Sequence, residues 1–354
     1  MKKMRFGEIS AAEFDEFERA SERTNIFQIT ARARLREKMG CKSYILGVFL
    51  GEKLVGAGIL LEKGGEGWIA YGPLLDWSDK KIVSYFMEEV VDLARRKGMM
   101  RIEVFPYILV SRRAPSGEIL DKYITYDVFT TMSRAGFRYE GEATTYQMKA
   151  NRWSFVKDLT GIASVDELRN SYSRNIRRIL RKVEGMVEVR KLERKEIGLV
   201  KEMIDDSNEK NGVAGRGLDY YEQIYDTFGA EAEFVGVFAV GDGRIVAGGM
   251  FIEHGDELVD YISGVRTEDR DLFGNVVLVD YMLRECLERG VARFNMFWIE
   301  GMFEGNKLLE FKAKFGGVVE EYVGGFERVL RPFDWFLVRI WRKIRGILRK
   351  ILRK

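Results

Sequence analysis

The chain has 354 residues, of which 46% are apolar and 32% are charged, and its formal net charge is +3. This length allows two domains of ordinary size, and the apolar content is sufficient for a substantial core. The apolar stretches are too short or too interrupted by charge to span a bilayer. The acidic residues that follow Met1 are unlike the apolar run of a signal peptide.

Cysteine and histidine are too scarce to support several kinds of chemistry. The two cysteines, Cys41 and Cys286, are far apart in the chain and show no CxxC spacing. A disulfide framework or a zinc site is therefore not expected, and a reducing compartment fits. His254 is the single histidine and stands in a predicted turn. This argues against metal binding and against a histidine general base.

The first predicted element is a β-hairpin over residues 47–61, GVFLGEKLVGAGILL, in which a glycine-containing turn separates two strands. A helix follows over residues 79–98 and ends at Gly98 as its C-cap. The chain then enters a strand at residues 101–105, RIEVF. The first part of the chain therefore reads as a hairpin, a further strand, a helix and another strand.

A basic helix is predicted next. Ser164 and Glu167 form a capping box that opens a helix through Glu184, and a domain boundary is expected near residues 150–165. From Leu168 onward this helix carries Arg169, Arg174, Arg177, Arg178, Arg181 and Lys182. The cations fit either a solvated helix face or a contact with phosphates of tRNA or of a nucleotide sugar.

The second half repeats the pattern of the first about 190 residues later. Residues 236–252, GVFAVGDGRIVAGGMFI, again predict a hairpin that opens with Gly-Val-Phe. The helix of residues 275–290 again ends at a glycine, Gly290, and leads into the strand RFNMF. A helix packed on a mixed sheet in this order is typical of an N-acyltransferase of the GNAT type, so the sequence predicts two such units in tandem.

The phosphate-binding loop of ordinary GNAT enzymes is missing from both halves. Coenzyme A is held there by backbone N–H groups of a glycine-rich loop at the start of the main helix. The first half has PLLDWSDKK at this place and the second has RTEDRDLFGN. We therefore expect that coenzyme A is not used.

Arg216 and Tyr220 are a candidate pair for binding substrate. They are four residues apart in GRGLDYYEQIYDTF and would share one face of a helix. An arginine fork beside a phenol suits a phosphate or a carboxylate. A plain surface pair is the alternative interpretation.

The C-terminal segment is a basic amphipathic helix. From Trp335 to Lys354 there are eight basic residues and no acidic one, so the remainder of the chain is net acidic. Apolar residues recur between the bases at Leu337, Ile340, Trp341, Ile344, Leu348, Ile351 and Leu352. This pattern favours residues 335–354 binding an anionic membrane surface; docking on the protein's own acidic body is the alternative.

The predicted fold class is therefore α+β: two tandem GNAT-like units, with mixed sheets flanked by helices, and a C-terminal basic amphipathic helix. The expected boundaries are residues 1–155 for the first unit, 156–332 for the second and 333–354 for the helix. The last strand follows the second unit, and the sequence leaves open whether it returns to the first.

The run FKAKFGG at residues 311–317 resembles the closing signature of the Fem family (FemABX), the peptidoglycan-bridge aminoacyltransferases. Three shorter stretches agree with the family in the same order. They are Ile26-Phe27-Gln28, Tyr71-Gly72-Pro73 and SRNIRRILRK at residues 173–182. The resemblance covers the chain to about residue 332, and the Phe-Lys-x-x-Phe-Gly-Gly motif is its most specific part.

The resemblance implies two GNAT-like units with a substrate site between or beside them. It implies transfer of an amino acid from aminoacyl-tRNA to an amine of a cell-wall precursor peptide, with aminoacyl-tRNA as co-substrate and without coenzyme A. By the same resemblance, Lys312 and Phe311 would lie at the acyl-transfer centre. Arg216, Tyr220 and Tyr261 would face the precursor. A cytoplasmic protein, peripheral at the inner membrane face, follows from these substrates and the basic helix.

Lys312 would stabilise the negative charge that develops on the ester carbonyl oxygen, or would hold a phosphate of the terminal adenosine. Lys314, two residues later, is expected to face solvent. The family's Asp-Pro pair is replaced by Phe105-Pro106 here, with Glu103 the nearest acid, and no general base is evident. For the family's amino-terminal lysine, Arg34 or Arg36 is the closest cation, and Arg36 is taken as substrate-binding.

Two other functions remain open from the residues alone. One is a GNAT-fold N-acyltransferase that uses another acyl donor on a surface-polymer or small-molecule amine. The other is a non-catalytic module that binds membranes. The sequence does not determine the amino acid transferred, the acceptor amine or the oligomeric state.

Overall fold

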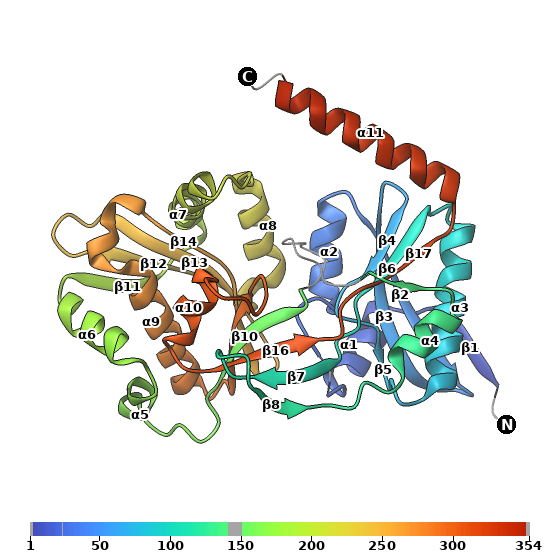
Figure 1. Ribbon diagram of the computed structural model, residues 1–354, viewed down its shortest axis with the longest axis horizontal. Helices are drawn as coiled ribbons and strands as arrows, with labels where there is room; N and C mark the ends of the chain where they lie inside the picture. Colours follow the sequence, from blue (N-terminus) through green and yellow to red (C-terminus); the bar gives the residue numbers. More distant parts are fainter. Residues whose placement is uncertain (1–2, 23, 141–150, 352–354) are drawn as a thin grey trace.

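The computed structural model describes residues 3–22, 24–140 and 151–351. Two mixed β-sheets lie side by side with helices on their faces, and helix α11 extends away from both (Figure 1). The predicted α+β class and the two sheet-and-helix units are confirmed.

The first sheet has the strand order β1-β2-β3-β4-β6-β17-β9, with β5 paired to β3. Its strands are β1 (Met4–Glu8), β2 (Lys42–Leu50), β3 (Lys53–Lys63), β4 (Glu66–Ile69), β5 (Leu74–Leu75), β6 (Arg101–Val104), β9 (Arg138–Tyr139) and β17 (Phe326–Val329).

The second sheet has the order β11-β12-β13-β14-β15-β10-β16-β7-β8. Its strands are β7 (Leu109–Arg113), β8 (Ile119–Lys122), β10 (Trp153–Asp158), β11 (Val187–Lys191), β12 (Ala232–Ala239), β13 (Ile245–His254), β14 (Glu257–Val265), β15 (Arg293–Trp298) and β16 (Val318–Tyr322).

The helices fall in the segments between these strands. They are α1 (Ala11–Arg19), α2 (Thr30–Lys38), α3 (Lys80–Arg96), α4 (Val128–Arg134), α5 (Val165–Asn170), α6 (Arg174–Val183), α7 (Ile197–Lys210), α8 (Leu218–Phe228), α9 (Gly274–Arg289), α10 (Lys307–Ala313) and α11 (Pro332–Ile351). Short 3₁₀ turns occur at residues 194–196, 229–231 and 267–272.

The internal repeat is visible in the strand pairing. Both predicted hairpins form, as β2–β3 and as β12–β13. In each sheet one strand that precedes the main helix pairs in parallel with the strand after that helix: β4 with β6 across α3, and β14 with β15 across α9. Gly98 and Gly290 follow these helices with φ of +74° and +72°, a conformation that costs glycine little.

The two sheets exchange strands. After β6 the chain crosses to the second sheet, where β7 pairs with β16. After β16 it crosses back, and β17 pairs with β6 and β9 of the first sheet. The final strand thus returns to the first sheet, and β10, β16 and β7 run between the two halves (Figure 1).

One core is continuous across the two sheets. It joins apolar residues of α1, α2 and β3 to those of α7, α8, β12 and β13, so these helices form a layer between the sheets. The outer face of the first sheet packs on α3 and α4, and the outer face of the second packs on α5, α6, α9 and α10. Because a shared apolar core resists separation, the two units form one body.

The basic helix predicted through Glu184 is interrupted. Ser164 caps α5 by accepting a hydrogen bond from the amide of Glu167, as the sequence predicts, but α5 ends at Asn170. A turn at Ser171–Ser173 follows, and the Ser173 side chain caps the new helix α6. Tyr172, buried within this turn, packs edge-on against Phe315 at 5.4 Å. Burial of this ring against α10's end outweighs the local preference for a continuous helix.

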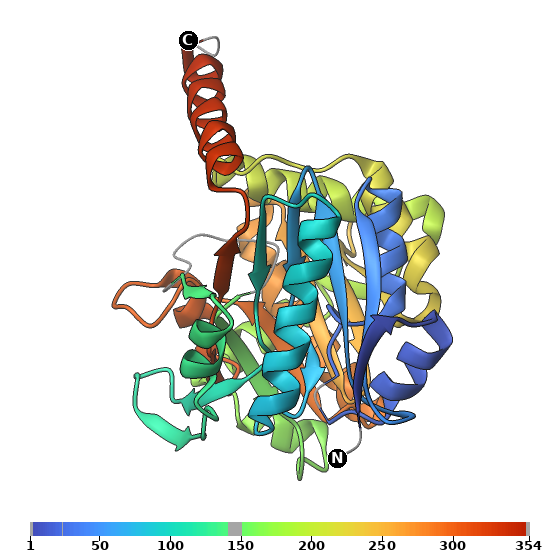
Figure 2. The same cartoon turned by 90° about the vertical axis from the view of Figure 1, so that its right-hand side faces the viewer.

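Helix α11 extends from the first half into solvent (Figures 1 and 2). Its described apolar side chains include Phe333, Phe336, Trp341 and Ile344, which are 72%, 57%, 57% and 51% exposed. Among the described residues, no helix combines the length and apolar character that crossing a bilayer requires. Residues 352–354, with the predicted apolar position Leu352, lie outside the described part of the chain.

Candidate functional site

Four polar side chains meet where the two halves join, and we call Arg32, Arg216, Tyr220 and Tyr261 the Arg–Tyr cluster. Nη1 of Arg32, on α2, donates a 3.1 Å hydrogen bond to the phenolic oxygen of Tyr261, on β14. The hydroxyl of Tyr220, on α8, donates to the same oxygen at 3.4 Å. The guanidinium of Arg216 lies 4.2 Å from the centre of the Tyr220 ring. The cluster therefore places two cations beside two buried phenols.

Arg32 makes Tyr261 acidic for a buried phenol. Burial raises the pKa of Tyr261, but the charge of Arg32 and the hydrogen bonds from Tyr220 and Arg32 outweigh it and lower the pKa to about 8. Burial and the neighbouring Tyr261 instead raise the pKa of Tyr220 well above its ordinary value. A pair of guanidinium groups with two phenols can bind the oxygens of a phosphate or a carboxylate.

Lys312 lies on α10 with its ammonium group buried against the end of β15. Its Nζ donates hydrogen bonds to the carbonyls of Met296 and Trp298, the latter at 2.7 Å, and lies 3.4 Å from the carbonyl of Phe297. Burial lowers the pKa of Lys312 to about 8, and the charge of Asp260 partly opposes this shift. The ammonium can therefore lose its proton within the ordinary working range of an enzyme.

Asp260, on β14, is the carboxylate coupled to Lys312. Burial raises the pKa of Asp260 to about 6, although Lys312 and a hydrogen bond from Ser263 lower it in part. Ser263 donates to Oδ2 at 3.3 Å, whereas Oδ1 is buried and has no hydrogen-bond partner among the described residues. Within that part of the chain Lys312 and Asp260 form no ion pair closer than 4.0 Å. A carboxylate that can take up a proton and an ammonium group that can release one therefore lie near each other in a partly buried environment.

The geometry arises where β14 and β15 separate, and we call this point the strand fork. Their parallel pairing extends only from Glu257 to Val259 on β14. Beyond it, Phe297 has a φ of +63°, which is rare for a bulky side chain and is often found at functional sites. The ring of Phe297 stacks on Tyr261 at 5.9 Å, while the carbonyls on either side of it accept hydrogen bonds from Lys312. Phe297 therefore connects the Arg–Tyr cluster to Lys312.

The predicted site residues do not all come together. Arg216, Tyr220 and Tyr261 lie in the Arg–Tyr cluster, and Lys312 lies at the strand fork. Phe311 packs edge-on against Phe315 at 5.5 Å on the second core.

Two other predicted cations lie elsewhere. Arg36 lies over the ring of Trp68 at 5.6 Å, outside the cluster. Lys314 is exposed, as expected. Arg216 is not on a helix: it precedes the N-cap Gly217 of α8 and still reaches Tyr220.

Arg32 and Asp260 were not predicted from the sequence. In TARARLREKMG, Arg32 follows Ile29 and precedes Leu35 by three residues each, so a helix would place it on the apolar face. Such a buried cation is a signal for function or for a specific partner. Asp260 likewise interrupts the apolar strand of residues 257–265 directly before Tyr261.

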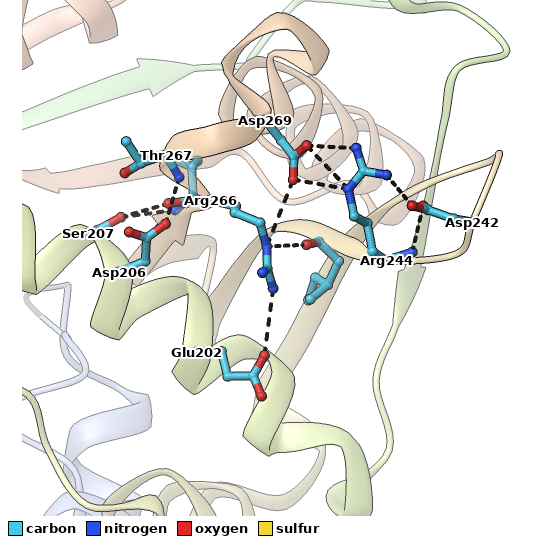
Figure 3. Close-up of polar contacts among 10 residues, drawn as sticks. Glu202, Asp206, Ser207, Asp242, Arg244, Arg266, Thr267 and Asp269 are labelled. Atoms are coloured by element: carbon cyan, nitrogen blue, oxygen red, sulfur yellow. Dashed lines mark hydrogen bonds and ion pairs between the residues drawn. The ribbon is translucent and has the colours of Figure 1, made fainter.

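The turn before α9, where a GNAT enzyme would hold a pyrophosphate, is occupied by internal carboxylate contacts (Figure 3). The amide of Thr267 donates a 2.6 Å hydrogen bond to Asp206, on α7. The carboxylate of Asp269 pairs with Arg244 at 2.7 Å and lies 3.9 Å from Arg266. An anion here would have to displace Asp206 and approach Asp269.

Histidine and cysteine lie away from the strand fork. His254 contacts Glu18 and Thr24, each at 2.7 Å, near the β13–β14 turn. Cys41 and Cys286 are buried free thiols. In the described residues no group of three or more histidine, cysteine or acidic side chains could hold a metal ion.

Comparisons with known proteins agree with this architecture. The model of the FemAB family matches residues 9–240 and 237–343. The aminoacyltransferase FemB of Staphylococcus epidermidis is 22% identical over 98% of this chain and 100% of its own length.

Two solved structures share the fold. The crystal structure of FemX superposes with a TM-score of 0.78 at 17% identity, over 94% of this chain and 99% of that one. A tandem GNAT protein from the clavulanic acid biosynthesis pathway gives a TM-score of 0.58 at 11% identity, over 92% and 98%. The predicted tandem GNAT-like fold is thereby confirmed.

Proposed function

This chain belongs to the FemAB family, and we propose that it is an aminoacyltransferase that joins an amino acid, taken from aminoacyl-tRNA, to an amine of a peptidoglycan-type precursor peptide. The observation that carries the proposal is the strand fork. There the Lys312–Asp260 pair and the Arg–Tyr cluster lie on either side of Phe297, in a fold shared with FemX.

The Arg–Tyr cluster is the proposed acceptor site. A cell-wall precursor carries phosphates and peptide carboxylates. A guanidinium group can bind two oxygens of either group through paired hydrogen bonds. Arg32 and Arg216 supply the positive charge. Tyr220 and Tyr261 supply hydroxyls, and the lowered pKa of Tyr261 makes its O–H a stronger hydrogen-bond donor to an anionic oxygen.

The reaction joins the amine to the ester carbonyl carbon of the aminoacyl-tRNA. A C–N bond forms, the C–O bond to the terminal ribose breaks, and the ribose oxygen takes up a proton. In our proposal Asp260 accepts the proton of the attacking amine and returns it to the ribose oxygen. Its Oδ1 has no hydrogen-bond partner among the described residues, so we assign the transfer to this oxygen.

Lys312 has two roles in the proposal. An ammonium group has three N–H donors, and two are directed at the carbonyls of Met296 and Trp298, so Lys312 holds the backbone around Phe297 in its left-handed conformation. The third donor has only the 3.4 Å contact with the carbonyl of Phe297. We assign this donor to the oxyanion that forms on the ester carbonyl, where a fixed cation lowers the barrier.

Coenzyme A has no place in the proposed reaction. The turn before α9 contains Glu268, Asp269 and Asp271, and its first amide already serves Asp206. A pyrophosphate needs free amides and low negative charge at this position. This arrangement supports an acyl donor that does not bind through a pyrophosphate.

The proposed location is the inner face of the cytoplasmic membrane, where α11 would lie on anionic lipid. Its exposed Phe333, Phe336 and Trp341 give one apolar face, and Arg339, Lys343 and Arg345 surround it with positive charge. Membrane binding would concentrate the enzyme at an acceptor in the form of a lipid-linked precursor peptide.

The fold likeness to a tandem GNAT protein favours one second candidate: an N-acyltransferase that uses a different acyl donor. Isothermal titration with acetyl-CoA distinguishes the two. Saturable binding would support the second candidate, and no binding is expected under the first.

The direct test of the proposed function is a transfer assay with radiolabelled aminoacyl-tRNA and a UDP-linked or lipid-linked precursor peptide. Label is expected to enter the peptide in an amide that resists mild base, which cleaves the tRNA ester. Asp260→Asn is expected to lower kcat by about 10²- to 10⁴-fold, the range of a general base, while thermal unfolding shows that the variant is folded. The absence of transfer from any aminoacyl-tRNA, by a folded protein, would refute the proposal.

A further inference from the structure

A second basic surface lies outside the strand fork, and our interpretation of it rests on the proposed function. Helices α6 and α9 and strand β11 enclose a groove of about 710 Å³, which we call the basic groove. Arg174, Arg177 and Arg181 line it from α6, and Arg169 and Arg284 line it from the opposite side. Its volume is that of a ligand site rather than of a surface crevice.

Two of these five arginines are paired with a carboxylate. Arg169 and Arg284 both donate to the buried carboxylate of Asp280, at 2.8 and 3.2 Å. Asp280 is 2% exposed, so this pairing satisfies a carboxylate that would otherwise be costly to bury. These contacts account for the two cations on structural grounds.

The three arginines of α6 are different. In the described residues no carboxylate lies within 4.0 Å of the guanidinium groups of Arg174, Arg177 or Arg181. Nε of Arg177 is buried and has no hydrogen-bond partner there. A row of cations at positions i, i+3 and i+7 of one helix face repels itself, and an anion in the groove would relieve this repulsion.

The row is longer than one phosphate group. Seven residues of helix separate Arg174 from Arg181, which is roughly 10 Å at 1.5 Å per residue. The row offers more cations than one phosphate group requires, whereas a nucleic-acid backbone presents successive phosphates along such a row. The groove is also concave, which suits a strand of RNA and not a flat lipid surface.

The start of α6 is attached to the helix that carries Lys312. The amide of Ser173 donates a 2.8 Å hydrogen bond to the carbonyl of Lys314. Lys157 bridges the same two segments, donating to Ser171 Oγ at 2.7 Å and to the carbonyl of Phe315 at 2.9 Å. The basic groove therefore begins beside the C-terminus of α10 and leads away from it.

We propose that the basic groove binds the sugar–phosphate backbone of the donor tRNA near its aminoacylated end. Arg174, Arg177 and Arg181 would each neutralise a phosphate, and the attachment of α6 to α10 would direct the terminal ribose toward Lys312. The groove thus selects the donor, and the Arg–Tyr cluster selects the acceptor.

The test compares two double variants of α6 with equal change in charge. Arg174→Glu/Arg181→Glu alters the groove, and Arg178→Glu/Lys182→Glu alters the part of the same helix that does not line it. Binding of deacylated tRNA is measured over a series of salt concentrations. The groove variant is expected to bind about tenfold or more weakly, with a salt slope reduced by about 2, one unit for each lost phosphate contact. The control variant is expected to keep the slope.

Kinetics separate this inference from the proposed function. The groove variant is expected to lose its preference for full-length aminoacyl-tRNA over an aminoacylated 3′-terminal trinucleotide, with an unchanged KM for the peptide acceptor. Equal effects of the two double variants would overturn the inference. A raised KM of the groove variant for the peptide acceptor would also overturn it. So would a groove variant that still binds tRNA but no longer binds anionic vesicles. Failure of the wild-type protein to transfer from either donor would instead refute the proposed function.

Discussion

Arg32 and Tyr261, 229 residues apart, are joined by a 3.1 Å hydrogen bond that crosses between the two halves of the molecule. Arg32 belongs to α2, which packs on the first sheet, and Tyr261 belongs to β14 of the second. Because of this hydrogen bond, the pKa of Tyr261 in one half depends on a cation that the other half supplies. It makes the joined structure, and not either unit alone, the source of the proposed acceptor site.

Removing this cation should change how Tyr261 titrates. In Arg32→Met the buried phenol loses the charge that lowers its pKa, so the transition near pH 8 is expected to move above the ordinary value for tyrosine. Ultraviolet difference absorbance of tyrosinate against pH measures this directly. Tyr261→Phe identifies the transition, and Arg36→Met, outside the cluster, is the matched control. A transition that stays near pH 8 in Arg32→Met would contradict the assignment.

The Lys312–Asp260 pair predicts a bell-shaped pH profile. Asp260 must be ionised to accept a proton, so kcat/KM should fall below about pH 6, and Lys312 must be charged, so it should fall above about pH 8. The Ser263 hydroxyl stabilises the ionised carboxylate, and its removal in Ser263→Ala raises the pKa of Asp260. The acidic limb is then expected to shift to higher pH while the alkaline limb stays. An acidic limb that persists unchanged in Asp260→Asn would show that another group titrates.

The diglycine after α10 predicts an effect on stability. Gly317 has a φ of +135°, and an added Cβ would lie 2.6 Å from the carbonyl oxygen of Val156. Gly98 has a φ of +74° with open space around it. Gly98→Ala should therefore cost about 1–2 kcal/mol of unfolding free energy from its backbone alone. Gly317→Ala, with the clash in addition, should cost about 3 kcal/mol or more. Urea denaturation measures both, and equal losses would argue against the close approach of β10.

The exposed face of α11 predicts binding to membranes. Ending the chain after Trp335 keeps the contact of this ring with Arg101, at 4.2 Å, and removes the rest of the helix. The shortened protein should no longer sediment with anionic vesicles, and binding of the full chain should weaken as salt rises.

A second variant separates the two contributions to this binding. Phe336→Ser/Trp341→Ser keeps every positive charge of the helix but lowers its apolar contact, so binding should weaken at all salt concentrations. Undiminished vesicle binding by the shortened protein would rule out α11 as the membrane contact.

Much of the fold could be predicted from the sequence because its signals are local. The two hairpins and the helices that end at Gly98 and Gly290 depend on periodicity and on glycine at a position with positive φ, both of which act within one turn of the chain. The neighbouring pair Arg216 and Tyr220 was found for the same reason, although Arg216 proves to precede the helix. The basic face of α6 is likewise evident from residue spacing alone.

Tertiary structure decided what those elements do together. The break at Ser171–Ser173 depends on Tyr172 reaching Phe315, and the exchange of β7 and β17 depends on which sheet edge each strand meets. Arg32 and Asp260 join the site only because distant segments pack against one another, which no local pattern encodes. Burial in that packing then sets the pKa values of Tyr261, Asp260 and Lys312. The sequence determines the residue types of the site, whereas the joined fold determines their partners and their pKa values.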